Sequence, residues 1–279
     1  MNVLHISAFS DGDTGGNPAG VVIGDTHPAP ADMQAAAAKV GYSETVFAMP
    51  TGDGRWRVRY FSPQSEVPFC GHATIALGAA LAGQFGEGVY DLVLNDAEIT
   101  VEGRKDEGRY HAALQSPETR SRISPPDLTG KVLDLFGYAK SDLDERIPPA
   151  VIHGGADHFV LALNARQTLS NMRYDMEAGR KLMTENGWVT ILLAHCENQH
   201  LFHTRNPFAS GGVYEDPATG AASAAFAGYL RDIDWPHAGG IEIIQGSDMG
   251  AQSRISIRIP DAKGSSVRVS GAARLMETT

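Results

Sequence analysis

The chain has 279 residues, of which 42% are hydrophobic, and carries a formal net charge of −10. This length suits one large domain or two domains of about 140 residues. The negative charge disfavours nucleic acid or an anionic membrane as a partner, although a local field in a cleft can still attract a small anion. With two cysteines, no long apolar stretch and no signal-peptide pattern at its start, the sequence predicts a cytoplasmic protein without disulfides or a membrane segment.

The first half predicts many short strands and two helices. An alanine-rich helix is expected over residues 30–40, because it begins after prolines and is followed by Gly41. A second helix over residues 72–85 has small residues on all sides, which favours burial inside a wall of strands. The predicted strands of this half are residues 2–9, 19–24, 45–49, 55–61, 90–95, 97–103 and 109–116.

The second half repeats this plan after a proline-rich stretch at residues 121–138. Helices are expected near residues 176–187 and over residues 220–230, and the second of these is again rich in small residues. The predicted strands are residues 149–155, 158–164, 188–196, 199–205, 241–247, 253–260 and 266–275.

These patterns predict an α+β protein with two pseudo-symmetric domains, each a barrel-like shell of strands around one central helix. We expect the first domain to span residues 1–118 and the second residues 119–261. The C-terminal segment 262–279 can return to pack with the first domain.

One short sequence occurs twice, once at the start of each small-residue helix. SEVPFCGHATIALGAAL spans Ser65–Leu81, and YEDPATGAASAAFAGYL spans Tyr214–Leu230. Common ancestry of the halves explains the shared glycines and alanines, but explains poorly why Glu, Pro and a Thr or Ser also recur. The informative differences are Val67 against Asp216, Cys70 against Thr219, and His72 against Ala221.

The start of a helix suits an anion, because about four backbone N–H groups there lack partners within the helix. Gly71 and Gly220 allow a ligand close to that backbone, so we predict a small anion held between the two helix starts in a cleft between the domains. His72 lies among the N–H groups, where imidazolium is disfavoured, and Pro217 favours an extended Asp216 at the rim. Each of these two side chains alone could be a capping or turn residue, but together they are acid–base candidates.

Several motifs in order along the chain resemble the phenazine-biosynthesis PhzF-like isomerases, relatives of diaminopimelate epimerase. They are GGNPAGVV from Gly15, YSETVF from Tyr42, PFCGHATIA from Pro68, YEDPATGAAS from Tyr214 and IQGSDMG from Ile244. The resemblance implies two similar domains of the diaminopimelate epimerase-like fold with the active site between them. It also implies catalysis without a metal or organic cofactor, and a homodimer.

By the same resemblance the catalytic residues are Glu44, His72 and Asp216. From the residues alone, Glu44 could also be a surface carboxylate at the start of a strand. Two departures from the family pattern, Ala221 in place of a frequent serine and Ala251 in place of a frequent arginine, concern the substrate more than the chemistry. The substrate-binding residues that we predict are Asn17, Ser43, Gly71, Ala73, Gly220, Ala221 and Ala222.

The reaction that we predict is a proton transfer within one small anionic metabolite. Relatives of diaminopimelate epimerase use two thiols, but here Cys70 is matched by Thr219, whose hydroxyl is far too weak a base. Glu44 would therefore remove a proton from carbon and return it elsewhere on the same molecule. The alternatives are a two-base epimerase or racemase of an amino or hydroxy acid, and a non-catalytic binding protein. We interpret Cys70 as a cap or packing residue, with a nucleophilic role as its alternative.

The run HCENQHLFH suggests zinc, but its spacing matches no ordinary zinc finger. We expect Glu197–Asn198 to form a hairpin turn that places the ligands on two strand faces, and we predict no metal site. The residues concerned are His195, Cys196, His200 and His203. The glycine-rich GDTGGNP lacks the lysine of a phosphate-binding loop, and we expect it to form a turn.

Overall fold

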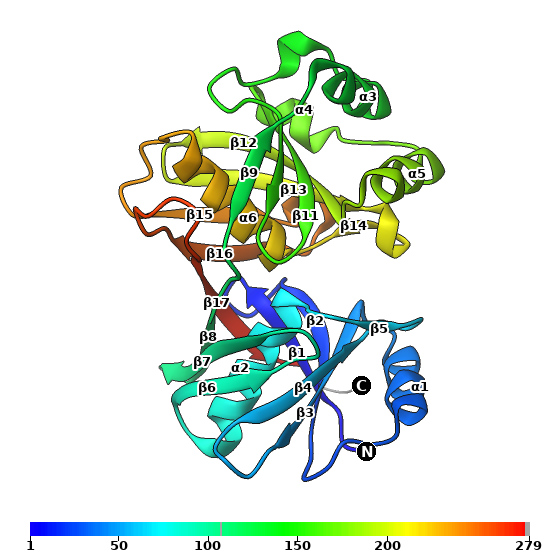
Figure 1. Cartoon of the computed structure of the whole chain (residues 1–279), viewed down its shortest axis with the longest axis vertical. Coiled ribbons are helices and arrows are strands. Elements are labelled where there is room, and N and C mark those ends of the chain that lie inside the picture. The colour runs from blue at the N-terminus through cyan, green and yellow to red at the C-terminus, as the bar shows by residue number, and fades with distance from the viewer. Residues whose placement is uncertain (107, 277–279) are drawn as a thin grey trace. The chain divides into compact units, whose positions relative to one another are not determined.

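The computed structural model of the chain describes residues 1–106 and 108–276 and separates them into two units (Figure 1). Unit 1 consists of residues 1–115 together with the segment that begins at Val269, and unit 2 consists of residues 116–268. Each unit arranges its strands around one buried helix, as the α+β prediction requires.

Unit 1 closes its strands into a ring around helix α2. The strands β17, β1, β2, β3, β4, β6, β7 and β8 pair in that order, and β8 pairs in turn with β17. The strands of unit 1 are β1 (Leu4–Ser10), β2 (Asn17–Ile23), β3 (Glu44–Pro50), β4 (Trp56–Phe61), β5 (Glu66–Val67), β6 (Gly88–Val93), β7 (Glu98–Asp106), β8 (Arg109–Gln115) and β17 (Arg268–Leu275). Its helices are α1 (Pro30–Val40) and α2 (Gly71–Phe85).

Helix α2 is buried on all sides from Gly71 to Ala82, which confirms the burial predicted from its small side chains. It packs against β1, β2, β7 and β8, and Figure 1 shows it among these strands. The contact with β7 is very close, because a Cβ atom added to Gly103 would lie 2.1 Å from the carbonyl oxygen of Gly78. Small residues at this contact are therefore a requirement of the packing.

Unit 2 also surrounds a small-residue helix, α6, which packs against β9, β10, β11 and β16. Its strands are β9 (Arg120–Ile123), β10 (Ala150–His153), β11 (Asp157–Leu163), β12 (Thr190–Asn198), β13 (Leu201–Phe208), β14 (Val213–Asp216), β15 (Gly240–Gln245) and β16 (Ser253–Arg258). Its α-helices are α3 (Pro126–Phe136), α4 (Arg166–Ser170), α5 (Met176–Asn186) and α6 (Gly220–Asp232), and its 3₁₀ helices are η1 (Lys140–Asp142), η2 (Ala209–Gly211) and η3 (Ser247–Met249).

The two units repeat one order of strand pairing. From β1 to β7, leaving out β5, successive pairs are antiparallel, parallel, antiparallel, parallel and antiparallel. From β10 to β16, leaving out β14, the same sequence of pairs occurs. The short strands β5 and β14 each precede the buried helix of their unit. The repeated sequence is therefore the same strand–loop–helix connection in both units.

Helix α3 was not predicted, because residues 121–138 were interpreted as a proline-rich stretch. The local signals for a helix were present: Pro126 stands in the first turn, and Gly137 ends the helix with a left-handed φ of 67°. The helix buries Val132, Leu133 and Phe136 in the core of unit 2. Its amphipathic spacing outweighs the two prolines before it.

Within the described part of the chain, no helix is both long enough and apolar enough to span a membrane.

Candidate active site

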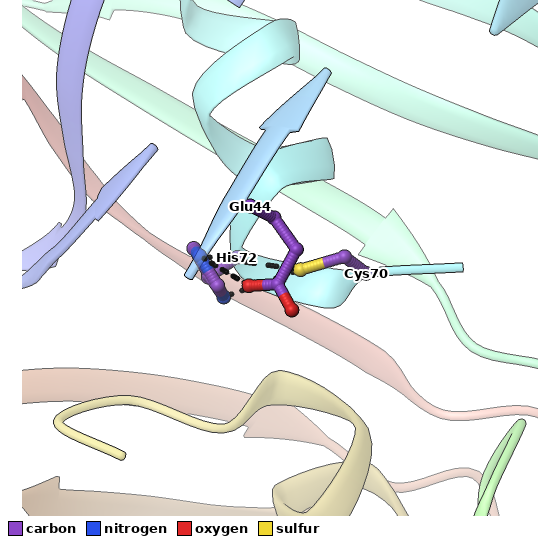
Figure 2. Close-up of side chains that lie close together, drawn as sticks. All are labelled: Glu44, Cys70 and His72. Carbon is purple, nitrogen blue, oxygen red and sulfur yellow. Dashed lines mark hydrogen bonds and ion pairs between the residues drawn. The ribbon is translucent and has the colours of Figure 1, made fainter. Parts of the chain in front are cut away.

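Three reactive side chains meet at the start of α2. Glu44 is the first residue of β3, Cys70 directly precedes α2, and His72 lies in its first turn. Figure 2 shows the three side chains pointing toward one another. His72 Nδ1 lies 3.3 Å from Cys70 Sγ, and His72 Nε2 lies 3.4 Å from Glu44 Oε2. The imidazole therefore stands between a thiol and a carboxylate, in contact with both.

This group is shielded from bulk water. The exposed fractions are 8% for Glu44, 9% for Cys70 and 4% for His72. The hydroxyl of Ser43 lies 3.3 Å from His72 Nε2. Charges interact more strongly in a site of low dielectric constant, so these groups are electrostatically coupled to one another.

The N-terminus of α2 has no side-chain cap from its N-cap residue. Cys70 occupies the capping position with extended backbone, yet makes no side-chain capping hydrogen bond, and the first turn holds no acidic residue. Cys70, interpreted from the sequence as a cap or packing residue, occupies the N-cap position and is buried, and its thiol contacts His72. The helix start keeps the partial positive charge that favours an anion.

A buried hydrogen-bond chain fixes this helix start. Thr74 Oγ1 donates to the carbonyl oxygen of Cys70 at 2.7 Å, and the hydroxyls of Thr74 and Tyr60 lie 2.7 Å apart. Burial raises the pKa of Tyr60, so its phenol stays uncharged and can hold this position at all physiological pH values.

The other predicted residues of unit 1 lie on the same elements. Gly71 and Ala73 flank His72 in the first turn of α2, and both are buried. Asn17 is the first residue of β2 and is 2% exposed. Strand β2 runs parallel to β3, with Ala19 paired to Glu44, so Asn17 and Glu44 begin neighbouring strands.

In unit 2, Asp216 is the last residue of β14 and stands just before α6. It is 6% exposed, and its Oδ2 accepts a hydrogen bond of 2.6 Å from Thr219 Oγ1. The predicted residues Gly220, Ala221 and Ala222 form the start of α6, which again has no side-chain cap and no acidic first turn.

Gln245, which was not among the predicted site residues, organises the start of α6. Its Nε2 donates to the carbonyl oxygen of Asp216 at 2.7 Å and to Thr219 Oγ1 at 3.0 Å, while its Oε1 accepts from the N–H of Thr219 at 3.2 Å. Gly246 follows with a left-handed φ of 76°, and a Cβ there would lie 2.8 Å from the carbonyl oxygen of Pro217. The signal was available in the motif IQGSDMG, which had served only to indicate the family resemblance.

The recurring glutamate of the repeat is structural. Glu66 of β5 forms an ion pair with Arg59 of β4, with distances of 2.8 and 2.6 Å. Glu215 of β14 forms the equivalent pair with Arg205 of β13, with distances of 2.9 and 2.5 Å. Each bidentate pair ties the short strand before the helix to its neighbour. These ion pairs explain why a glutamate recurs at the same position in both copies of the repeat.

Among the described residues, one group of three metal-ligating side chains converges: Glu44, Cys70 and His72, with ligand atoms all within 4.8 Å of one another. The HCENQHLFH run behaves differently, because each histidine has a separate partner. His195 Nδ1 lies 3.1 Å from the carbonyl oxygen of Leu163, and His203 Nε2 lies 2.5 Å from Glu197 Oε2.

The predicted hairpin turn in this run was two residues early. Strand β12 continues through Asn198, and the turn falls at residues 199 and 200. His195 is paired directly with His203 across the hairpin, so these two side chains share a face. Cys196 is the next residue of β12 and lies on the other face, so the candidate ligands are divided between two faces as predicted.

A protein-family model, the sequences of relatives and a solved structure each match nearly the whole chain. Residues 6–279 match the profile of the family described as phenazine biosynthesis-like protein. The chain is 29% identical to an uncharacterized isomerase of Mesorhizobium japonicum, over 98% of this chain and 95% of that one. It is 28% identical to the uncharacterized isomerase YfhB of Bacillus subtilis, over 99% and 97% of the two chains. The crystal structure of a Bacillus anthracis phenazine biosynthesis protein of the PhzF family superposes with a TM-score of 0.86 at 21% identity, over 99% and 98% of the chains.

Proposed function

Because the chain belongs to the phenazine biosynthesis-like protein family of isomerases, we propose that it moves a proton within a small anionic metabolite without a cofactor. Glu44 is the base in this proposal. The observation that carries it is the buried Glu44–His72 pair, with 3.4 Å between the carboxylate and the imidazole at an uncapped helix start.

The groups at the start of α2 suit a proton transfer that passes through an enolate. The Glu44 carboxylate removes a proton from carbon beside a carboxylate or carbonyl of the substrate, and the backbone N–H groups of the first turn stabilise the negative charge that develops. His72, in contact with Glu44, relays the proton or donates to the intermediate. Positioned acid–base groups of this kind each contribute about 10²–10⁴ in rate.

The geometry of unit 1 argues against a two-base epimerase built from Glu44 and Cys70. Two bases on opposite faces of one carbon stand about 6–7 Å apart, since each approaches the carbon to about 3–3.5 Å. The ligand atoms of Glu44 and Cys70 lie within 4.8 Å of each other, so both address a substrate from one side. Removal and return of the proton on one face by a single base is sufficient for an isomerisation.

We propose from the sequence repeat that Asp216 serves the same substrate as Glu44. Its carboxylate is held by Thr219, whose hydroxyl also accepts from Gln245. Thr219 therefore acts as a positioning residue. A carboxylate fixed in this way suits a hydroxyl or ammonium group of the substrate.

The test begins with a thermal-shift screen of small carboxylic acids that carry keto, hydroxy, amino or unsaturated groups next to the carboxylate. Acids that raise the melting temperature are then incubated with the protein in D₂O, and deuterium at carbon is followed by NMR and mass spectrometry. We expect exchange at two positions of one acid, with conversion to its isomer.

Glu44→Gln should lower the exchange rate by about 10²–10⁴, because the amide cannot accept the proton. Glu98→Gln is the matched control, since Glu98 lies on β7 of the same unit and is 70% exposed. Exchange at full rate in Glu44→Gln would show that another group is the base. An acid that binds tightly but never gains deuterium would instead support a binding protein.

A further inference from the structure

The cluster at the start of α2 has the composition of a zinc site. Zinc in proteins binds thiolate, imidazole and carboxylate ligands in a tetrahedron, and its catalytic-type sites use three protein ligands with the fourth position open. Cys70, His72 and Glu44 supply one ligand of each type. A thiolate combined with an imidazole favours Zn²⁺ over the hard ions Mg²⁺ and Ca²⁺.

The ligand atoms of the cluster all lie within 4.8 Å of one another, a wider spacing than in a tetrahedron already closed around zinc. With bonds of about 2.0–2.3 Å, neighbouring ligand atoms around zinc stand about 3.3–3.6 Å apart. His72 Nε2 lies 3.4 Å from Glu44 Oε2 and 4.0 Å from Cys70 Sγ. A zinc ion with Nε2 as its single imidazole ligand therefore requires the Cys70 side chain to turn toward His72 and Glu44.

The charges favour a divalent cation as well. A carboxylate and a thiolate that are about nine-tenths buried carry two negative charges, which Zn²⁺ neutralises. His72 binds as neutral imidazole, so the complete set of ligands and metal has no net charge.

We propose that Glu44, Cys70 and His72 form a Zn²⁺ site whose occupation switches the enzyme off. Zinc bound to Glu44 and His72 takes the lone pairs that the acid–base chemistry needs, and release of zinc restores them. The binding part of this inference stands independently, whereas the inhibition rests on the proposed function of Glu44.

The ligands were not predicted as a metal site, because they come from two separate segments. Glu44 lies on β3, whereas Cys70 and His72 lie at the start of α2. The sequence drew attention to the HCENQHLFH run instead, where His195 and His203 are engaged with Leu163 and Glu197.

Titration of the chelator-treated full-length protein with Co²⁺ tests the site directly. Tetrahedral Co²⁺ bound to a thiolate gives a charge-transfer absorption in the near ultraviolet, and added Zn²⁺ should remove it at one equivalent per chain. Cys70→Ser should abolish this band. Cys196→Ser should leave it unchanged, because the second cysteine contacts the carbonyl oxygen of Asn198 outside the cluster.

Glu44→Gln provides a second variant of nearly the same shape in case Cys70→Ser does not fold, which circular dichroism would reveal. It should keep the charge-transfer band but bind Co²⁺ at least about tenfold more weakly, since even outer-shell changes cost 10–100-fold in affinity. His203→Gln is the matched control for the other histidine cluster and should bind as the unaltered protein does.

The results separate this inference from the proposed function. A charge-transfer band that persists in Cys70→Ser, or Co²⁺ affinity that falls in His203→Gln but not in Glu44→Gln, would overturn the zinc site. Once a substrate is known, Zn²⁺ should suppress deuterium exchange and a chelator should restore it. Full exchange with the site occupied would overturn the inhibition, and the absence of any exchange would count against the proposed function alone.

Discussion

The contact between α2 and β7 gives a prediction that links the fold to the site. Gly103 is buried on β7, and a Cβ added there would lie 2.1 Å from the carbonyl oxygen of Gly78 and 2.9 Å from the Cβ of Ala82. Gly103→Ala must therefore push α2 away from the strand wall. The obstacle is helix backbone, which cannot rotate aside as a side chain would. The same helix carries His72 at its start.

The size of the effect follows from the displacement. Ordinary contacts of a Cβ atom begin at 3.4 Å, so the helix must retreat by 3.4 − 2.1 = 1.3 Å at this point. A buried Leu makes about 40–60 contacts of about 0.1–0.2 kcal/mol each, and a gap of about 1 Å forfeits about half of each. Loss on this scale at one helical turn costs about 2–3 kcal/mol, at the upper end of typical overpacking penalties.

Gly88→Ala is the matched control, because Gly88 is paired directly with Gly103 across β6 and β7. A Cβ added to Gly88 meets no atom within 4 Å. Both substitutions remove the same backbone freedom from the unfolded chain, which contributes about 0.4–1 kcal/mol of stability. The difference in unfolding free energy between the two variants therefore isolates the clash.

The assay is urea unfolding followed by the fluorescence of Trp56, the one tryptophan of unit 1, in a background with Trp188→Phe and Trp235→Phe. We expect Gly103→Ala to be less stable than Gly88→Ala by about 2–3 kcal/mol. Equal unfolding midpoints for the two variants would refute the close approach of α2 to β7.

Further predictions concern unit 2. Burial lowers the pKa of His158 to about 3, so as the pH falls below about 6.5 the unfolded state takes up the proton first. The contribution of neutral His158 to the free energy of unfolding is complete above pH 6.5 and is lost toward pH 3, with about 2 kcal/mol lost at pH 5. Chemical unfolding at pH 7.5 and at pH 5 should show this loss in the unaltered protein but not in His158→Asn. Glu215→Gln should cost about 3–5 kcal/mol of unfolding free energy, because it leaves the Arg205 guanidinium buried without its counter-charge. A double variant Arg205→Met/Glu215→Leu that is as unstable as Glu215→Gln would contradict this reasoning. Thr219→Val should lower the turnover of an identified substrate about tenfold, because it loses the hydrogen bond to Asp216. Thr219→Ser should retain most of the activity. Unchanged turnover in Thr219→Val would count against the positioning role.

Local patterns in the sequence were sufficient for much of the architecture. The small residues of α2 and α6 predicted two buried helices, because helices without a polar face must be covered on all sides. The repeated segment located the start of each of these helices. Helix α3 was missed although Pro126 and Gly137 marked its ends, since two adjacent prolines were given more weight than the spacing of Val132, Leu133 and Phe136.

The site could be predicted only in part. His72 and Asp216 followed from their places in the repeat, whereas Glu44 followed from the family resemblance. Gln245 was missed because its hydrogen bonds to Asp216 and Thr219 join residues far apart in the sequence. Spacing along a chain carries no information about such contacts unless a strand pairing is known.

The sequence by itself determined the two-part plan, the two helix starts and the presence of Thr219 where the repeat matches Cys70, since these depend on local composition and on the order of residues. Only the tertiary structure decided that the thiol of Cys70 faces His72, that Glu44 approaches the same imidazole, and that the recurring glutamates bind Arg59 and Arg205. Those contacts arise from the pairing of strands β2 with β3, β4 with β5 and β13 with β14. Each depends on long-range register, which the folded chain fixes and local sequence does not.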